Sequence, residues 1–189
     1  RPLLPHTHIG LRPMAVTLEM VLASRDERSL LQRRMLASAP GLALVVATVV
    51  VPGPEKRTEV TLRIAGAMDR ALRQAFDGLV REEVSRDLPT GYEGFFLVDT
   101  TCAEAKRLAV RVEETHPLGR LFDIDVIGPD GVPLSRTGSG GAPRRCLLCG
   151  DNARICMRER KHSIDELTAY IRSLTDEYFG RIRDSHDTP

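Results

Sequence analysis

The sequence contains no tryptophan and only three tyrosines and five phenylalanines, so it offers few rings on which nucleic-acid bases can stack. It also has no excess of charge of either sign, because 27 basic and 26 acidic residues leave a formal net charge of +1. A protein that coats nucleic acid needs surplus lysine and arginine to neutralise phosphates. We therefore expect no nucleic-acid partner.

Lysine is scarce, since only Lys56, Lys106 and Lys161 occur among the 27 basic residues and the rest are arginines. Arginine suits fixed, bidentate recognition of oxyanions. The longest apolar run, residues 42–51, is about half of what a membrane-spanning helix needs, so no membrane association is expected. No stretch near the N-terminus combines a basic start, an apolar middle and a small-residue cleavage site, as an export signal does. We therefore expect a cytoplasmic protein.

We expect an irregular N-terminal arm over residues 1–15, which contains three prolines, and a single domain over residues 16–189. Helical patterns cover residues 16–37, 58–75 and 101–115, and β-rich runs cover 42–51, 94–98 and 121–127. A turn at 128–131 makes the last run a hairpin candidate. A Cys-rich element at 144–162 and a C-terminal helix at 163–179 complete the domain. The fold class is α/β or α+β, with a central mixed sheet flanked by helices.

Two aspartates, Asp123 and Asp125, are separated by one residue within a strand-like segment. Side chains alternate along a strand, so both carboxylates lie on one face, with Cα atoms roughly 6.5 Å apart. They can converge on a divalent ion that neutralises a polyphosphate and steadies a departing pyrophosphate. The alternative is a half-exposed strand with two solvated aspartates.

The residues around the aspartates suit phosphate binding. Gly119 permits close approach of a backbone, and Arg120 and Arg136 are suited to clamp phosphate oxygens bidentately. A turn glycine and surface ion pairs are the alternatives. His116 is suited to act as a general base, although a histidine that caps the end of a helix is an equal alternative.

The stretch from His116 to Val126, the pair Ser135-Arg136 and the stretch from Arg144 to Cys149 resemble the apo-citrate lyase phosphoribosyl-dephospho-CoA transferase family. Residues 24–28 (Ser-Arg-Asp-Glu-Arg) and 52–56 (Pro-Gly-Pro-Glu-Lys) agree with it too. The similarity extends over about residues 18–179.

The resemblance implies a nucleotidyltransferase, so that residues 16–189 form a catalytic domain, with a nucleotidyltransferase-like fold as one expectation. It would move phosphoribosyl-dephospho-CoA from triphosphoribosyl-dephospho-CoA to a serine of the citrate lyase acyl carrier protein subunit and release diphosphate. Asp123 and Asp125 match the family's Asp-x-Asp, and we assign them Mg²⁺ by analogy with other nucleotidyltransferases. An enzyme with the same chemistry and a different acceptor is the alternative.

Two further roles stay open at this point. Lys56 follows a rigid Pro-Gly-Pro turn and either reaches the triphosphate as a point charge or is an exposed loop lysine. A third metal-binding carboxylate is often needed, and its candidates are Asp99, Glu113, Glu114 and Asp130.

Cys146, Cys149, Cys156 and His162 supply three thiolates and one imidazole, a set that suits tetrahedral zinc in a structural role. A pocket of reduced thiols is the alternative. Basic residues outnumber acidic ones over residues 144–161, which suits either docking of an acidic acyl carrier protein or a solvated rim. A zinc-knuckle module that binds nucleic acid is disfavoured by the charge balance and the lack of aromatics.

Overall fold

The computed structural model describes residues 15–134 and 145–186, and their centre is a four-stranded sheet with the order β2-β3-β1-β4. The strands are β1 (Ala43–Val49), β2 (Val80–Leu88), β3 (Gly91–Val98) and β4 (Phe122–Ile127). The α-helices are α1 (Leu18–Ser38), α2 (Glu59–Ala75), α3 (Cys102–Thr115), α4 (Ala153–Glu159) and α5 (Ile164–His186), and a short 3-10 helix, η1 (Gly119–Leu121), leads into β4.

Each strand is antiparallel to its neighbours. Helix α2 connects β1 to β2, and α3 connects β3 to β4, so each helix joins two strands that run the same way. Each crossover passes over one intervening strand, which keeps the parallel strands from becoming neighbours. The arrangement is the split β-α-β topology. The expected central sheet with flanking helices is confirmed, but its neighbouring strands are all antiparallel rather than mixed in sense.

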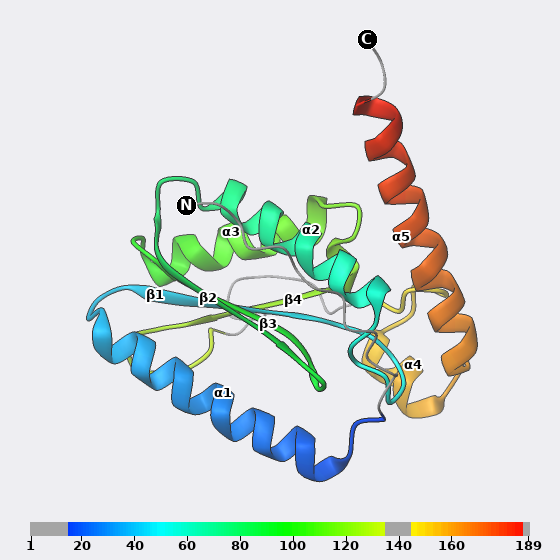
Figure 1. Ribbon diagram of the computed structural model, residues 1–189, viewed down its shortest axis with the longest axis horizontal. Helices are drawn as coiled ribbons and strands as arrows, with labels where there is room; N and C mark the ends of the chain where they lie inside the picture. Colours follow the sequence, from blue (N-terminus) through cyan, green and yellow to red (C-terminus); the bar gives the residue numbers. More distant parts are fainter. Residues whose placement is uncertain (1–14, 135–144, 187–189) are drawn as a thin grey trace.

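The sheet is covered on both faces (Figure 1). Helix α1 lies on one face, and α2 and α3 lie on the other. The larger apolar cluster fills the space under α2 and α3, where Ile64, Met68 and Leu72 meet Phe96 and Phe122. The smaller cluster lies under the C-terminal half of α1. It consists of Leu31, Met35, Leu44, Val46, Phe95, Leu97 and Ile127.

Side-chain caps begin the helices where the sequence predicts them. The Thr58 side chain accepts from Thr61 N, and the Thr101 side chain accepts from Glu104 N. At α5, Ser163 and Glu166 bond reciprocally as a capping box. One expectation differs: Ser24 does not restart a helix but lies inside the continuous α1, which Thr17 caps.

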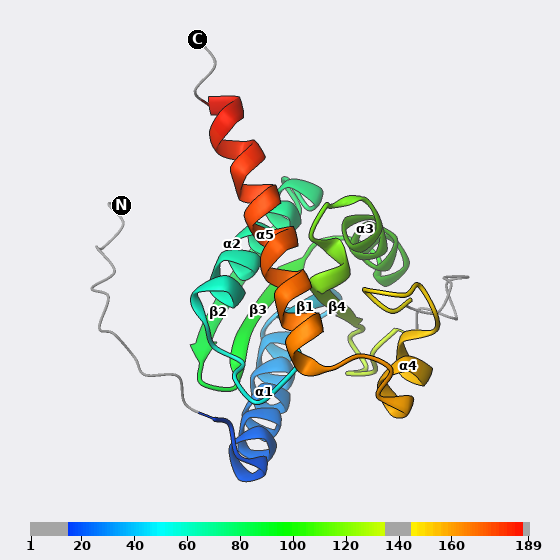
Figure 2. The same ribbon diagram turned by 90° about the vertical axis from the view of Figure 1, so that its right-hand side faces the viewer.

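Helix α5 crosses one end of the helical layer, and its C-terminal part extends away from the body of the domain (Figure 2). Ile171 is buried in the larger cluster, and Tyr178 and Phe179 pack against it. The Cys-rich element with α4 lies on the side of the molecule where β4 forms the sheet edge. Within the described ranges, no helix is long and apolar enough to cross a membrane.

Three of the described elements have no counterpart in the sequence prediction, namely β2, η1 and α4. The hairpin candidate is met in part, because Ile127 and Pro133 form an isolated antiparallel bridge and Leu134 N donates to Val126 O at 2.7 Å. Most of the predicted N-terminal arm lies outside the described residues.

Candidate functional site

Asp123 and Asp125 lie on the same face of the edge strand β4, the face that α1 covers. Along β4, Phe122, Ile124 and Val126 belong to the cluster under α2 and α3, whereas Ile127 belongs to the cluster under α1. Asp123 is half-buried and Asp125 is exposed. Both carboxylates therefore share a face with Ile127, as the alternation in the sequence predicts, and they sit on a strand whose other face is anchored in the core.

A polar row crosses the sheet at the level of Asp123. In register, Asp123 pairs with Thr48 of β1, Thr48 pairs with Glu93 of β3, and Glu93 pairs with Arg86 of β2. Paired residues in antiparallel strands project from the same face. With strands about 4.8 Å apart, the Cα atoms of Asp123 and Glu93 are separated by roughly 10 Å. The α1 face is thus apolar at one end of the sheet and polar at the other.

Glu93 is a buried carboxylate held between two arginines, and its exposed fraction is 2%. Arg28 Nε of α1 donates to its Oε1 at 2.7 Å, and Arg86 Nε donates to its Oε2 at 3.0 Å. Ser24 Oγ donates to Oε1 at 3.4 Å and accepts from Thr90 Oγ1 at 2.9 Å. This buried group satisfies the rule that a charge removed from water must be paired and hydrogen-bonded. Arg86 also pairs with Glu27 of α1 at 3.4 Å, so two guanidinium groups and two carboxylates balance one another beside the row that contains Asp123.

The residue between the two aspartates is anchored by side chains of α3. Glu113 Oε1 accepts from Ile124 N at 2.9 Å, and Lys106 Nζ donates to Ile124 O at 3.5 Å. Both side chains are buried, with 5% and 3% exposed. Because β4 is the sheet edge, no further strand within the described part of the chain pairs with its outer backbone groups at this position. Helix α3 supplies the missing partners and so fixes the backbone that carries both carboxylates.

Lys56 lies at the same end of the sheet, in the loop after β1. Its Nζ donates to Val51 O at 2.7 Å, and its Cβ lies 3.7 Å from where a Cβ on Gly91 would be. Gly91 is two residues before Glu93 in β3. Burial lowers the pKa of Lys56. The lysine therefore approaches the polar row from the loop side, although its ammonium bonds within its own loop.

His116 lies on the opposite side of the sheet from the aspartates. Its ring packs against Phe122 and Tyr178, with centroids 4.9 Å and 5.1 Å away. Nδ1 accepts from Leu118 N at 3.0 Å, and Nε2 is 3.2 Å from the Tyr178 hydroxyl. Burial, aided by Arg70, lowers the pKa of His116. The ring therefore bonds to Leu118 N and faces Tyr178, and both the general-base role and the capping of the helix end stay predictions.

Gly119 and Arg120 have partners within the protein. A Cβ on Gly119 would lie 2.3 Å from Glu113 O, so glycine lets η1 close against the end of α3. The Arg120 guanidinium donates to Arg145 O, which precedes the first cysteine of the Cys-rich element. Arg136 lies outside the described residues. The predicted phosphate contacts of these three residues stay predictions.

The four candidate zinc ligands come together. The ligand atoms of Cys146, Cys149, Cys156 and His162 all lie within 4.8 Å of one another. We call this group the cysteine–histidine cluster. It is separate from the polar row, and the Arg120 to Arg145 bond connects its segment to the residues just before β4.

The choice of a third metal-binding carboxylate stays open, and the polar row contains one further acidic residue that the sequence reasoning missed. Asp99 pairs with Arg81, Asp130 accepts from Val132 N in a turn, and Glu113 holds Ile124. Glu93 is the carboxylate that shares the row with Asp123. The sequence does contain a signal for Glu93. In a strand, Glu93 lies on the same face as the apolar Phe95 and Leu97, so a charged side chain takes an inward-facing position.

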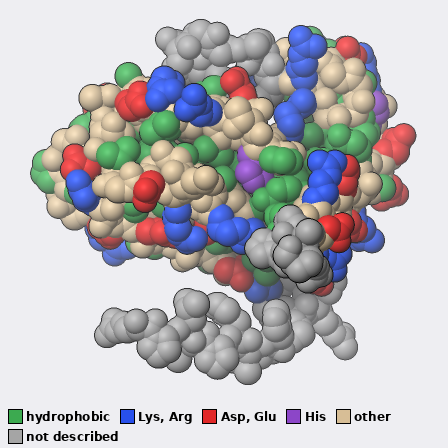
Figure 3. Space-filling model, turned by 90° about the horizontal axis from the view of Figure 1, so that it is seen from above, with side chains coloured by type: hydrophobic (Ala, Val, Ile, Leu, Met, Phe, Trp, Pro, Cys, Tyr) green, Lys and Arg blue, Asp and Glu red, His purple; other side chains and the backbone are tan. Residues whose placement is uncertain are grey.

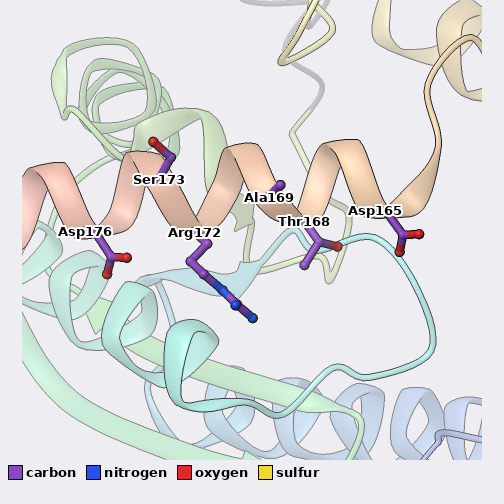
Figure 4. A pocket seen from close by; sticks show the side chains of 6 residues that line it. All are labelled: Asp165, Thr168, Ala169, Arg172, Ser173 and Asp176. Carbon is purple, nitrogen blue, oxygen red and sulfur yellow. The ribbon is translucent and has the colours of Figure 1, made fainter.

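Other surface features lie elsewhere. A shallow groove of about 420 Å³ runs along α5 (Figure 4), and it contains none of the predicted site residues. Its lining is Asp165, Thr168, Ala169, Arg172, Ser173 and Asp176. On the face seen from the side of α2 and α3, basic and acidic side chains are interspersed (Figure 3). That distribution accords with the balanced overall charge.

Comparison with known proteins places these features in a family. The family model described as apo-citrate lyase phosphoribosyl-dephospho-CoA transferase matches residues 16–178. A protein of that name from Shigella flexneri serotype 5b is 38% identical over 168 residues, which cover 86% of this chain and 90% of that protein. One from Escherichia coli O6:K15:H31 is 39% identical over 166 residues, with the same coverage of both chains.

A longer relative, Protein CitXG of Haemophilus influenzae, is 34% identical over 165 residues, which cover 86% of this chain but 36% of that protein. The matched range contains α1, the whole sheet, the residues of the polar row and the cysteine–histidine cluster. The chain therefore belongs to the apo-citrate lyase phosphoribosyl-dephospho-CoA transferase family.

Proposed function

We propose that this protein transfers phosphoribosyl-dephospho-CoA from triphosphoribosyl-dephospho-CoA to a serine of the citrate lyase acyl carrier protein subunit in the cytoplasm. Family membership supports the reaction class. One structural observation supports the position of the active site on the molecule. Three separate segments that carry the family resemblance meet at one end of the α1 face. Ser24 and Arg28 bind Glu93, Lys56 lies against Gly91, and Asp123 belongs to the same row.

In this reaction the serine oxygen attacks the α-phosphorus of the donor, and the bond from that phosphorus to the diphosphate oxygen breaks. Diphosphate leaves with the electron pair, and the serine proton passes to a base or to solvent. The product is a phosphodiester. Negative charge is concentrated on the polyphosphate throughout, so the site must supply positive charge next to it.

The aspartate pair fits an oxygen-ligated cation, because Mg²⁺ is bound through one or two carboxylates together with substrate phosphates. Asp123 and Asp125 would hold it, and the ion, when bound, would offset polyphosphate charge and polarise the phosphoryl oxygens. The rigid mounting of β4 by Lys106 and Glu113 suits this role, since a metal site needs ligands held by well-packed supports.

Cationic side chains would bind the donor's phosphates. Arg28 and Arg86 keep 32% and 20% of their side chains exposed, and to bind phosphate each would share its guanidinium with Glu93. Lys56 would reach the triphosphate by leaving its bond to Val51 O. Arg120 and Arg136 are the further candidates from the sequence.

The acceptor would dock on α4. Arg154 and Arg158 are exposed there, next to Met157, which is 76% exposed. Lys161 is less available, because it pairs with Asp151 at 3.0 Å. An acidic carrier surface suits such a patch. Reversing Arg158 to Glu should raise the KM for the carrier and weaken its salt dependence, whereas an unchanged KM would leave the patch as a solvated rim.

The experiment that tests the function is incubation of the protein with Mg²⁺, triphosphoribosyl-dephospho-CoA and apo-carrier, followed by mass spectrometry of the carrier. We expect a mass increase equal to phosphoribosyl-dephospho-CoA and release of one diphosphate per transfer. A carrier with the acceptor serine changed to alanine is the control. Release of diphosphate without carrier modification would instead favour a different acceptor, and no release of diphosphate at all would contradict the proposal.

A further inference from the structure

The cysteine–histidine cluster has the geometry of a closed metal centre. The ligand atoms of its four residues lie within 4.8 Å of one another, and the sulfurs of Cys146 and Cys156 are 3.4 Å apart. A tetrahedral zinc ion with Zn–S bonds of about 2.3 Å separates its sulfur ligands by roughly 3.8 Å. A disulfide needs about 2.05 Å, so the two sulfurs are too far apart to be bonded. The four cysteines of the chain are all free thiols.

His162 points to the same interpretation. Its Nε2 is buried and has no hydrogen-bond partner among the described residues. A buried polar atom without a partner costs free energy comparable to that of a lost hydrogen bond. A metal ion at the centre of the cluster would satisfy this nitrogen, and neutral imidazole is a preferred ligand of zinc. We propose that Cys146, Cys149, Cys156 and His162 bind one structural zinc ion.

The backbone around the cysteines is arranged as a support for such an ion. Cys146 N donates to Asp151 O at 2.5 Å, and Lys161 N donates to Cys156 O at 3.2 Å. The loop that carries the first two ligands is therefore closed onto Asp151, just before α4, and the residue that precedes His162 is fixed to Cys156.

Charge also suits a zinc centre with three sulfur ligands and one nitrogen ligand. Three thiolates and one Zn²⁺ carry a net charge of −1. The same element carries the exposed Arg154 and Arg158 on α4 and Lys161 just after it. Nearby cations favour the thiolate form that zinc requires.

The ion would be structural, because four protein ligands complete a tetrahedron and leave no open position for substrate. The segment that it would hold has little apolar core of its own: Cys146 and Cys156 are buried, and Leu147 is the residue that reaches the main cluster. This segment joins the start of α5 to the region before β4, where Arg120 bonds to Arg145 O. Zinc would thus fix the partner of Arg120.

Metal analysis of the purified full chain tests the proposal, independently of any transferase assay. We expect one zinc per chain in protein kept under reducing conditions. Cys149→Ser and His162→Ala should each lower that ratio well below one, while Cys102→Ser should keep it, since Cys102 is a free thiol outside the cluster. Replacing zinc by Co²⁺ should give the absorption bands of a tetrahedral thiolate-bound cobalt ion.

The wild-type measurements remain decisive if a cluster variant fails to fold. His162→Cys provides a further check, because a fourth thiolate still completes the tetrahedron and should keep zinc bound. A wild-type ratio far below one with all four thiols reduced would overturn the proposal. So would a cobalt spectrum without thiolate bands.

Discussion

Arg28 of α1 binds Glu93 of β3 through a 2.7 Å bond between Nε and Oε1, across 65 positions of sequence. The N-terminal half of α1 is therefore held to the sheet by charge, whereas its C-terminal half is held by Leu31 and Met35. Several exposed apolar residues on α1, such as Leu18 and Leu22, do not contribute to this packing.

Changing Glu93 to Gln keeps the shape of the side chain but removes the charge that Arg28 and Arg86 share. We expect a loss of about 1–3 kcal/mol in the free energy of unfolding, the range for hydrogen bonds to charged groups. A fully buried pair would lose more, but both arginines reach solvent. Urea unfolding measures the change.

Asp99→Asn is the matched control for that measurement, because Asp99 pairs with Arg81 at the surface, where both side chains are about half exposed. A surface pair contributes about 0–1 kcal/mol. Equal losses in the two variants would mean that the buried Glu93, with Arg28 and Arg86, does not stabilise the position of α1.

Asp123→Asn and Asp125→Asn should each reduce transfer by at least about 100-fold, because each removes charge that the proposed Mg²⁺ site needs. The free energy of unfolding should change by no more than about 0.5 kcal/mol, since neither side chain is buried. Carrier modification followed by mass spectrometry gives the rate. Glu104→Gln is the control, because Glu104 pairs with Arg107 on the surface of α3 and is not a candidate metal ligand. Near-normal turnover in both variants would remove the metal-site proposal.

The sequence predicts those elements whose signals are local. Apolar runs and caps within a short stretch of sequence predict β1, the start of α2 at Thr58, the start of α3 at Thr101 and the capping box at Ser163. The shared face of Asp123 and Asp125 follows from the period of a strand. The cysteine spacing likewise predicts that the cysteine–histidine cluster comes together.

Features that depend on distant partners could not be read in this way. Ser24 with Glu27 has the pattern of a capping box, but its hydroxyl bonds to Glu93, so tertiary contacts override the local signal. Strand β2 is largely polar, and its identity as a strand depends on pairing with β3. His116 begins the longest stretch of the family resemblance, yet its ring packs against Phe122 and so lies on the sheet face opposite Asp123.

Glu113→Leu should loosen β4, because it removes the acceptor for Ile124 N. We expect a loss of about 1–3 kcal/mol in the free energy of unfolding, since a buried donor loses its partner. Hydrogen exchange at the Ile124 amide should accelerate relative to other core amides. Glu113→Gln keeps an acceptor oxygen and should retain more of the protection. Unchanged exchange at Ile124 in the leucine variant would contradict this anchoring role.

Gly119→Ala should destabilise the protein by about 1–3 kcal/mol, the usual cost of overpacking. The new Cβ would lie 2.3 Å from Glu113 O, and both partners are backbone or attached directly to it, so the chain itself must shift. Gly66→Ala is the control, because Gly66 lies within α2 and its Cβ would meet only the flexible end of Arg70 at 3.6 Å. That change should stabilise the helix by about 0.5–1 kcal/mol. Urea unfolding of both variants separates a steric effect from a general intolerance of glycine replacement.

His116 makes the free energy of unfolding depend on pH. Burial, with a smaller contribution from Arg70, lowers the pKa of His116 in the folded protein. In the unfolded chain the pKa of a histidine is about 6.5. Below that pH the unfolded chain binds a proton that the folded protein does not, so stability falls as the pH drops towards the folded pKa. Above it, both states are neutral at His116 and this contribution does not vary.

His116→Gln keeps an acceptor for Leu118 N and a polar partner for the Tyr178 hydroxyl but does not titrate. Unfolding of the wild-type protein and of this variant should be measured from about pH 8 to about pH 5.5, a range that spans the unfolded pKa. The difference between the two curves cancels the contributions of other groups. We expect wild-type stability to fall more steeply on acidification, because the variant has no imidazole to protonate on unfolding. Parallel curves would show that the His116 pKa is the same in both states, contrary to its burial between Phe122 and Tyr178.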